Sequence, residues 1–267
     1  MTTIKELSNL KGRRALITGA TGGLGKVMAA TLAELGADLI LVDRLEPDLD
    51  SLSKNLTERW GVKVEWQVCD LEQQAQRTEL MASLKSSSHG LNILINNAAF
   101  VGTSDLPGWG VPFEQQTVET WRRALEVNLT AIFDLCQGLT PLLKVAQGAS
   151  IINIASIYGM YGPDWSLYEG TSMSNPAAYG ASKGGLIQFT RWLATTVAPY
   201  IRVNSISPGG IFRSQPESFV QRYEERTPLH RMATEDDFRG AVAYLVSDMS
   251  KYVTAQNLAV DGGWGAW

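Results

Sequence analysis

The chain has 267 residues, of which 45% are hydrophobic and 19% charged, and its net charge is −4 at pH 7. It contains no run of lysine and arginine, so neither nucleic acid nor an anionic membrane surface is an expected partner. The first residues, MTTIKELSNLKGRR, contain no apolar core of a signal peptide, and no stretch approaches the roughly 18 apolar residues of a membrane span, which predicts a cytoplasmic protein.

Short apolar runs alternate with amphipathic segments along the chain. The runs predict buried strands at 14–18, 38–43, 62–68, 91–95, 150–155, 201–206 and 257–260. Helical spacing predicts helices at 24–35, 47–59, 71–85, about 117–144, 178–197 and 235–247, and a loop rich in glycine and proline at 100–112. Strands that alternate with helices favour a parallel sheet covered on both faces. We therefore predict a single α/β domain over residues 1–267, with a Rossmann-like doubly wound sheet.

Cysteine and histidine are too few to organise a site. Cys69 and Cys136 are the only cysteines and lie far apart, which predicts two buried thiols rather than a disulfide framework. The chain has 2 histidines, both isolated, so we expect no metal site and no serine–histidine–aspartate triad.

A glycine-rich turn joins the first predicted strand to the first predicted helix. It reads TGATGGLG and begins at Thr18. Glycine suits a sharp turn, a close approach of the backbone to a diphosphate, and tight packing of helix on sheet. Amide groups at the start of the helix would then face the phosphates. This turn predicts dinucleotide binding by Gly19, Thr21, Gly22, Gly23, Leu24 and Gly25.

An acidic residue ends the second predicted strand. Asp43 can accept hydrogen bonds from the adenosine ribose hydroxyls and would repel a 2′-phosphate, which favours NAD over NADP. Arg44 beside it could instead accommodate that phosphate, and both residues are assigned to the cofactor site.

Further motifs occur in a fixed order. Asn96-Asn97-Ala98-Ala99 follows the fourth strand, Ser156 the fifth and Pro208-Gly209 the sixth, while Tyr179 and Lys183 lie four positions apart on a predicted helix. With the glycine turn, these residues resemble the classical branch of the short-chain dehydrogenase/reductase family over nearly the whole chain. The resemblance implies a catalytic tetrad of Asn128, Ser156, Tyr179 and Lys183. It also implies cofactor contacts from Asp70, Leu71, Asn97, Ala98, Ala99, Tyr179, Lys183, Pro208, Gly209 and Ile211.

The spacing of Tyr179 and Lys183 also makes chemical sense by itself. Residues i and i+4 share one face of a helix. A tyrosine titrates near 10, and a neighbouring ammonium should lower its pKa toward the operating pH, as acid/base catalysis requires. Ser156 would hydrogen-bond the reacting oxygen, and Asn128 would fix a water beside the lysine.

Ser156 and Tyr179 are 23 positions apart, which is longer than in most members of the family. The extra segment, 161–176, is rich in glycine, proline, serine and aromatic residues, so we expect an inserted loop beside the active site. Tyr158, Trp165 and Tyr168 are the candidate substrate contacts in this region.

The segment 212–232 is polar and weakly patterned, which predicts a substrate lid. Arg213 stands where many family members have a threonine near the nicotinamide carboxamide, and it could hold an anionic group of a substrate. Trp264 and Trp267 near the end of the chain are unusual side chains to leave in water. Since the family often packs this end across a subunit interface, we expect a homo-oligomer, in particular a tetramer.

These features predict reversible oxidation of a secondary alcohol to a ketone with NAD. The spacing of Tyr179 and Lys183 argues against the enoyl-reductase branch. The insertion and the run Ser207-Pro208-Gly209-Gly210-Ile211 resemble bacterial oxidoreductases of flagellin-modifying, sialic-acid-like sugars, which points to a sugar, polyol or sugar-derived acid as the small-molecule substrate. A 3-oxoacyl-thioester reductase is the alternative enzyme, and a non-catalytic dinucleotide-sensing module is the alternative from another class.

Overall fold

Seven parallel strands form the central sheet of the protein, whose computed structural model describes residues 1–87, 90–101 and 106–267. In space the strands follow the order β3-β2-β1-β4-β5-β6-β7, and all neighbours in this order are parallel. This arrangement confirms the predicted doubly wound α/β fold. The strand bounds are β1 (Arg14–Thr18), β2 (Asp38–Asp43), β3 (Val64–Val68), β4 (Ile93–Asn96), β5 (Ala149–Ile154), β6 (Ile201–Pro208) and β7 (Asn257–Val260).

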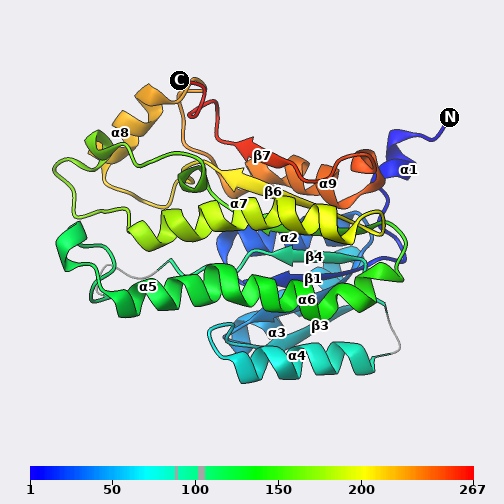
Figure 1. The fold of residues 1–267 in the computed structure, drawn as a ribbon. Helices are drawn as coiled ribbons and strands as arrows, with labels where there is room; N and C mark the ends of the chain where they lie inside the picture. Colours follow the sequence, from blue (N-terminus) through cyan, green and yellow to red (C-terminus); the bar gives the residue numbers. More distant parts are fainter. Residues whose placement is uncertain (88–89, 102–105) are drawn as a thin grey trace.

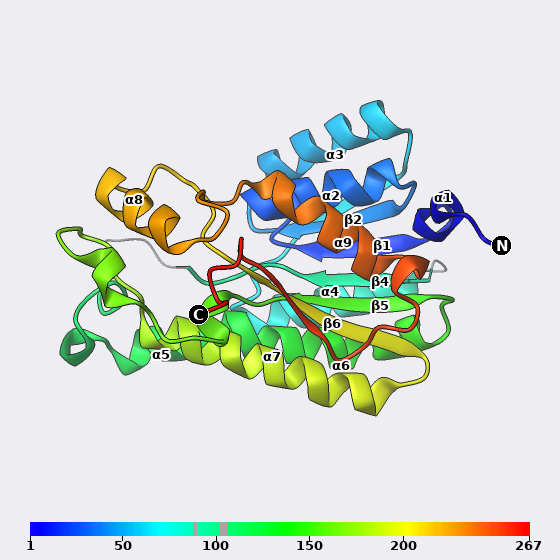
Figure 2. The ribbon, with the colours of Figure 1, turned by 90° about the horizontal axis from the view of Figure 1, so that it is seen from above.

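Helices cover both faces of this sheet (Figure 1 and Figure 2). The interior residues of the central strands are buried on both sides, which is why these strands appear in the sequence as unbroken apolar runs. One face packs against α2 (Gly23–Glu34), α3 (Glu46–Trp60) and α9 (Arg239–Val246). The other packs against α4 (Gln74–Ser86), α6 (Ala131–Lys144) and α7 (Ala177–Val197).

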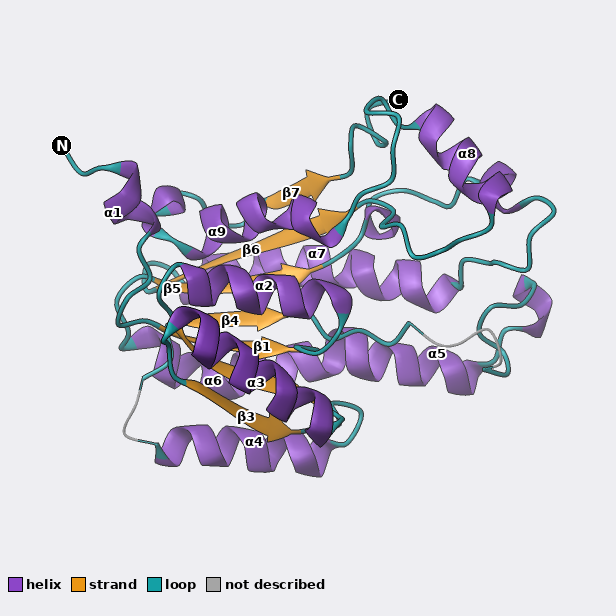
Figure 3. Ribbon diagram, turned by 180° about the vertical axis from the view of Figure 1, so that it is seen from behind, coloured by secondary structure: helices purple, strands orange, loops and turns teal. Residues whose placement is uncertain are grey.

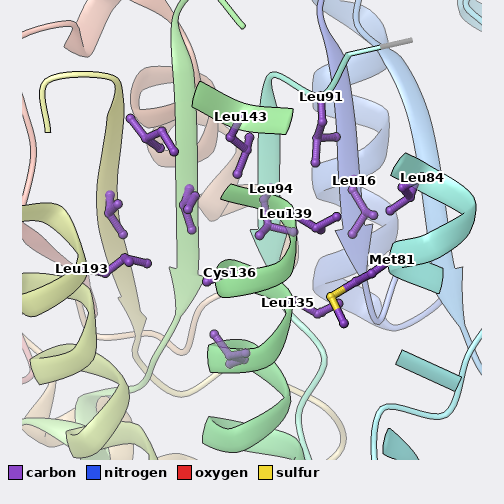
Figure 4. Packing of buried hydrophobic residues seen from close by; sticks show 14 of the residues in the cluster. Leu16, Met81, Leu84, Leu91, Leu94, Leu135, Cys136, Leu139, Leu143 and Leu193 are labelled. Carbon is purple, nitrogen blue, oxygen red and sulfur yellow. The ribbon is translucent and has the colours of Figure 1, made fainter. Parts of the chain in front are cut away.

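The core on the second face is formed mainly by leucine. Leu135, Leu139 and Leu143 of α6 recur at helical spacing, are fully buried and are directed at the sheet (Figure 4). Met81 of α4 lies beside them. Cys69 and Cys136 are both free and buried, as predicted, and burial raises the pKa of Cys136 to about 12.

The chain reverses its direction of winding at β1. It builds β1, β2 and β3 outward on one side and then returns through α4 to place β4 on the other side of β1. In such a sheet a crevice opens at the carboxyl ends of the two strands that flank the reversal. Figure 3 shows the strand arrowheads pointing toward the side of the molecule where α8 (Glu217–Arg226) lies.

The prediction of one continuous helix over 117–144 is wrong, because the structure has two helices there. The segment consists of α5 (Val118–Leu125) and α6, joined by a π-helical turn at Glu126–Thr130. A π-helical turn holds more residues than an α-helical turn, and such turns often occur at functional sites. The apolar spacing continues through the interruption, so periodicity alone could not reveal it. Asn128 lies inside this turn.

Two short helices were not predicted. The helix α1 (Ile4–Ser8) begins with a reciprocal cap between Thr3 and Glu6, but it is too short to show a period. The helix α8 lies within the segment 212–232, which was predicted only as a polar lid. The remaining helices and strands begin and end within a few residues of the predicted positions.

Two further segments bear on the site. The inserted segment 161–176 includes a 3-10 turn at Trp165–Tyr168 and is otherwise irregular. Of the predicted loop 100–112, residues 102–105 lie outside the described ranges. No helix within those ranges is long and apolar enough to cross a membrane.

Candidate active site

A cavity of about 790 Å³ opens at the carboxyl ends of the central strands. Its wall brings together all the residues that the sequence analysis assigned to the cofactor, together with Ser156 and Arg213. The assigned residues in the wall are Gly19, Thr21, Gly22, Gly23, Leu24, Gly25, Asp43, Arg44, Asp70, Leu71, Asn97, Ala98, Ala99, Tyr179, Lys183, Pro208, Gly209 and Ile211.

The glycine turn is shaped by backbone contacts that leave no room for side chains. Gly19 has a φ of 63°, and a Cβ atom there would lie 2.8 Å from the Cα of Ala98. A Cβ atom on Gly25 would overlap the carbonyl oxygen of Gly19 and lie 2.8 Å from the Cα of Ala20. Glycine at both positions therefore lets the chain turn sharply and lets α2 approach the sheet.

The first turn of α2 offers amide donors to a ligand. Its N-cap, Gly22, provides no side-chain hydrogen bond, and the first turn holds no acidic residue. The first amides of a helix have no partner within the helix and carry the positive end of its dipole. The glycine cradle and these donors fit a dinucleotide diphosphate, so the residues present are suited to an NAD-type cofactor.

Asp43 is held rigidly at the end of β2. Its Oδ2 accepts hydrogen bonds from the backbone N of Thr21 at 2.9 Å and from the Oγ1 of Thr21 at 2.7 Å. Its Oδ1 accepts from the backbone N of Arg44 at 2.8 Å. These bonds fix the carboxylate at the cavity wall, where its remaining lone pairs can accept from a diol.

Asn97 clamps the glycine turn from the neighbouring strand. Its Nδ2 donates to the carbonyl oxygens of Thr18, at 3.0 Å, and Gly19, at 2.9 Å. The Oγ1 of Thr18 in turn accepts from the backbone N of Asn97 and of Ala98, both at 3.1 Å. The motif after β4 thus stabilises the motif after β1, which local sequence could not show.

The loop after β3 is tied to the helices behind it by two arginines. Arg123 of α5 donates from Nε to the carboxylate of Glu72 at 2.6 Å, and the pKa of Glu72 is lowered by this hydrogen bond. Arg77 is almost fully buried; it donates to the carbonyl oxygen of Leu71 and forms ion pairs of 2.8 Å with Glu126 and Asp134. Leu71 is therefore connected through Arg77 to Glu126 of the π-helical turn that carries Asn128.

Ser156, Tyr179 and Lys183 all line this cavity. Lys183 is 1% exposed; its Nζ donates to the carbonyl oxygen of Ile154 at 2.7 Å and lies 5.8 Å from the centre of the Tyr179 ring. Burial lowers the pKa of Lys183 to about 8.

Burial also raises the pKa of Tyr179, while a hydrogen bond from Ser156 and the charge of Arg213 act in the opposite direction. The pKa of Tyr179 in the protein alone is thus raised and not lowered as expected, because desolvation of the phenolate is the larger effect. A lowering by Lys183 stays a prediction.

Asn128 is fully buried and does not line the cavity. Its Oδ1 accepts from the backbone N of Phe100 at 2.6 Å, and its Nδ2 donates to the Oγ of Ser182 at 3.1 Å. Ser182 precedes Lys183 on α7, so Asn128 connects the loop after β4 to the helix that carries Tyr179 and Lys183. The bound water expected for Asn128 stays a prediction.

Arg213 lies over the start of α2. Its Nη2 is 3.2 Å from the Oε1 of Glu235, and 55% of its side-chain surface is exposed. A Cβ atom on Gly23 would lie 2.6 Å from the Oε1 of Glu235 and 3.0 Å from the Nη2 of Arg213. Both charged groups therefore rest against the first residue of α2.

The three predicted aromatic substrate contacts lie outside the wall of this cavity, and their contact with substrate stays a prediction. Tyr158, Trp165 and Tyr168 are not part of the cavity wall; the hydroxyls of Tyr158 and Tyr168 are 2.7 Å apart, and Trp165 is 56% exposed. Tyr168 belongs to an aromatic cluster that joins the insertion, α8 and the C-terminal segment. The buried members of this aromatic cluster are Ile157, Leu167, Tyr168, Phe219, Tyr223, Met232 and Trp264.

The position of Trp264 corrects the expectation that this side chain packs across a subunit interface. Trp264 is 1% exposed because it packs within its own chain: its ring lies 6.2 Å from that of Tyr223, stacked, and the guanidinium of Arg226 lies 4.6 Å above it. Trp264 therefore gives no argument for a subunit interface, whereas Trp267 is 72% exposed.

Several further residues of the cavity wall were not identified from the sequence. They lie on loops or on helix faces where no motif marks them, although a polar residue after a strand end is a usable signal for Glu72. These residues include Leu45, Glu72, Phe100, Val101, Leu106, Arg123, Val127 and Gln215.

Comparison with known proteins gives consistent matches over the whole length of the chain. A family model described as "Enoyl-(Acyl carrier protein) reductase" matches residues 19–265. A tropinone reductase homolog of Arabidopsis thaliana is 34% identical, covering 96% of this chain and 93% of the relative. The 3-oxoacyl-[acyl-carrier-protein] reductase FabG of Thermotoga maritima is 31% identical, covering 95% of this chain and 98% of the relative.

Solved structures agree. A short chain dehydrogenase from Leptospira borgpetersenii with bound NAD+ has a TM-score of 0.84 and 34% identity, covering 99% of this chain and 96% of that chain. A gluconate 5-dehydrogenase from Burkholderia cenocepacia, in complex with NADP and tartrate, has a TM-score of 0.86 and 27% identity, covering 99% of this chain and 100% of that chain.

Proposed function

Because the chain belongs to the short-chain dehydrogenase/reductase family, and is therefore an NAD(P)-dependent oxidoreductase of alcohols and ketones, we propose that it interconverts a secondary alcohol and a ketone with NAD. The substrate class that we propose is a sugar, a polyol or a sugar-derived acid. The observation that carries this proposal is the convergence of Ser156, Tyr179 and Lys183 on one cavity with the glycine turn and Asp43.

The roles of the three side chains follow from their positions. When bound, the oxidised cofactor accepts a hydride, and its positive charge lowers the pKa of a nearby phenol. Tyr179 Oη removes the hydroxyl proton of the alcohol and returns it in the reverse direction. The hydroxyl of Ser156 donates a hydrogen bond to the reacting oxygen. Lys183, with its pKa near 8, supplies positive charge beside the phenolate at neutral pH.

Tyr179→Phe tests this mechanism directly. Removal of the phenol oxygen should lower kcat by roughly 100-fold or more, since general acid–base catalysis contributes about that much, and should leave the Kd of NADH within about 2-fold. Absorbance of NADH at 340 nm, followed for wild type and variant, measures the first effect. Turnover that survives the change at the wild-type rate would refute Tyr179 as the acid/base.

The substrate panel should contain polyols, sugar acids, amino-sugar derivatives and 3-oxoacyl thioesters. The resemblance of the insertion to oxidoreductases of sialic-acid-like sugars supports the sugar classes, as does the similarity to a gluconate 5-dehydrogenase. The similarity to a 3-oxoacyl-[acyl-carrier-protein] reductase supports the alternative enzyme. Binding of NADH without turnover on any of these compounds would favour the non-catalytic sensing module.

The proposed preference for NAD rests on Asp43. Its carboxylate is held by Thr21 and Arg44 at the cavity wall, where a 2′-phosphate would meet a fixed negative charge. Asp43→Asn keeps the shape and removes the charge, so the ratio of kcat/KM for NAD to that for NADP should fall by roughly 10-fold, the effect of about 1.4 kcal/mol. An unchanged ratio would show that residues other than Asp43 determine the preference between NAD and NADP.

A homotetramer and a cytoplasmic location stay predictions. Light scattering on the purified protein would measure the mass of the assembly against 29.2 kDa for one chain. The roles of the segments 161–176 and 212–232 in substrate binding also stay predictions, and alanine variants of Trp165 that change the KM of the substrate would support the first.

A further inference from the structure

Four cationic side chains of the described residues line the cofactor cavity, and they differ in what holds them. Arg123 is engaged by Glu72, and Lys183 by the carbonyl oxygen of Ile154. Arg44 follows Asp43, the residue proposed to bind the adenosine ribose, and its backbone N donates to the Asp43 carboxylate. The fourth, Arg213, is the one that lies against the glycine turn.

The backbone around Arg213 is shaped to present this side chain. The Oε1 of Gln215 accepts from the backbone N of Arg213 at 2.7 Å, and the Nε2 of Gln215 donates to the carbonyl oxygen of Ile211 at 2.8 Å. Ser214 between them has a φ of 58°, in the left-handed region that a residue with a side chain rarely adopts. A tight turn, closed by one glutamine, thus directs Arg213 toward α2.

Two opposite charges meet where α2 begins. The carboxylate of Glu235 and the guanidinium of Arg213 both lie close to Gly23, whose neighbouring amides are uncapped. An anion held by those amides would lie beside both groups, so it would be attracted to Arg213 and repelled by Glu235. The Arg213 side chain is 55% exposed and that of Glu235 is 29% exposed. An ion pair that is partly open to solvent contributes little stability, so its rearrangement costs little free energy.

We propose that Arg213 binds the diphosphate of the dinucleotide, and that Glu235 is the anion that positions its guanidinium before the cofactor arrives. A guanidinium offers paired donors that match two phosphate oxygens. This inference rests on the proposed function and assigns Arg213 to the cofactor rather than to an anionic group of the substrate. Glu235 acts through Arg213 and is a positioning residue.

Binding to ligands that differ only in the diphosphate tests the inference without turnover. The Kd of NADH is measured by fluorescence of the reduced nicotinamide, and the Kd values of ADP-ribose and adenosine by displacement of NADH. ADP-ribose contains the diphosphate, and adenosine does not. The variants are Arg213→Ala, Arg213→Lys and Glu235→Gln. Arg191→Ala is the control, because it removes one exposed positive charge from α7 at a position about two helical turns beyond Lys183 and outside the cavity wall.

Arg213→Ala should weaken NADH and ADP-ribose about 10-fold, as expected for the loss of a charge-assisted hydrogen bond at a partly exposed site, and leave adenosine within about 2-fold. Arg213→Lys should recover part of the loss, since it keeps the charge but not the paired donors. Glu235→Gln keeps an Oε1 acceptor that can still position the guanidinium but removes the repulsion of the diphosphate, so the Kd of NADH should fall about 2-fold or more. Higher salt should reduce the difference between wild type and Arg213→Ala.

Other results would overturn the inference in distinguishable ways. Equal Kd values of NADH for wild type and Arg213→Ala, with a raised KM for an acidic substrate, would assign Arg213 to the substrate. If Arg191→Ala weakened NADH binding as much as Arg213→Ala does, the effect would be due to the net charge of the protein and not to a contact of Arg213. Failure of the wild type to bind NADH at all would overturn this inference together with the proposed function, whereas binding that is insensitive to Arg213 would overturn the inference alone.

Discussion

The glycine turn and the aromatic cluster lie at the same end of the sheet but are built on different principles. The turn requires glycine at set positions, because Gly19 and Gly25 approach the backbone of neighbouring segments. The aromatic cluster is formed by side chains from three segments, around Tyr168, Tyr223 and Trp264. The first depends on backbone sterics, which few residue types satisfy, and the second on packing, which many apolar residues satisfy. A region of the first kind is therefore visible in the sequence, and one of the second kind is not.

The largest effect should come from Gly25→Ala. The added methyl group overlaps the carbonyl oxygen of Gly19, so the turn must open and binding of NADH should be lost in a fluorescence titration. Gly240→Ala is the matched control, because a Cβ atom there meets nothing within 4 Å. That variant should bind NADH as the wild type does. Normal NADH binding by Gly25→Ala would show that the turn is as tolerant as the aromatic cluster and break the comparison.

Trp264→Ala should act on stability rather than on the cofactor. Removal of a fully buried tryptophan costs about 3–5 kcal/mol, and denaturation with urea measures the loss in the free energy of unfolding. Trp267→Ala, at an exposed position, should cost less than about 0.5 kcal/mol. The Kd of NADH should stay unchanged if the two regions are energetically separate. A Kd that rises with the loss of stability would instead show that the aromatic cluster supports the turn.

The smallest effect should be a change with pH that is linked to Lys183. Between about pH 8 and pH 10 the unfolded chain holds a proton that folded Lys183 has released, so the free energy of unfolding gains a positive slope with pH. Lys183→Met removes this contribution, and stability curves of the two proteins should diverge by about 2 kcal/mol across the window. Parallel stability curves would mean that burial changes the pKa of Lys183 little.

The sequence predicted the parts of the molecule that repeat a local rule. Apolar runs marked the buried strands, and the spacing of Tyr179 and Lys183 placed both on one face of α7. What it missed depends on contacts between distant segments. The burial of Trp264 needs Tyr223 and Arg226, and the effect of burial on the pKa of Tyr179 depends on everything that surrounds it. Neither can be derived from the spacing of residues along the chain.

The interrupted helix makes the protein unequally sensitive to the loss of a single residue. An α-helix advances about 100° per residue, so one deletion within α6 would rotate all that follows away from the sheet and disrupt the core. A deletion within Glu126–Thr130 could be absorbed by reversion of the wider turn to ordinary α geometry, which keeps α5 and α6 in phase with their neighbours. That reversion would move Asn128 off Phe100 and Ser182. Deletion of one residue within this turn would therefore leave a folded protein with a damaged active site.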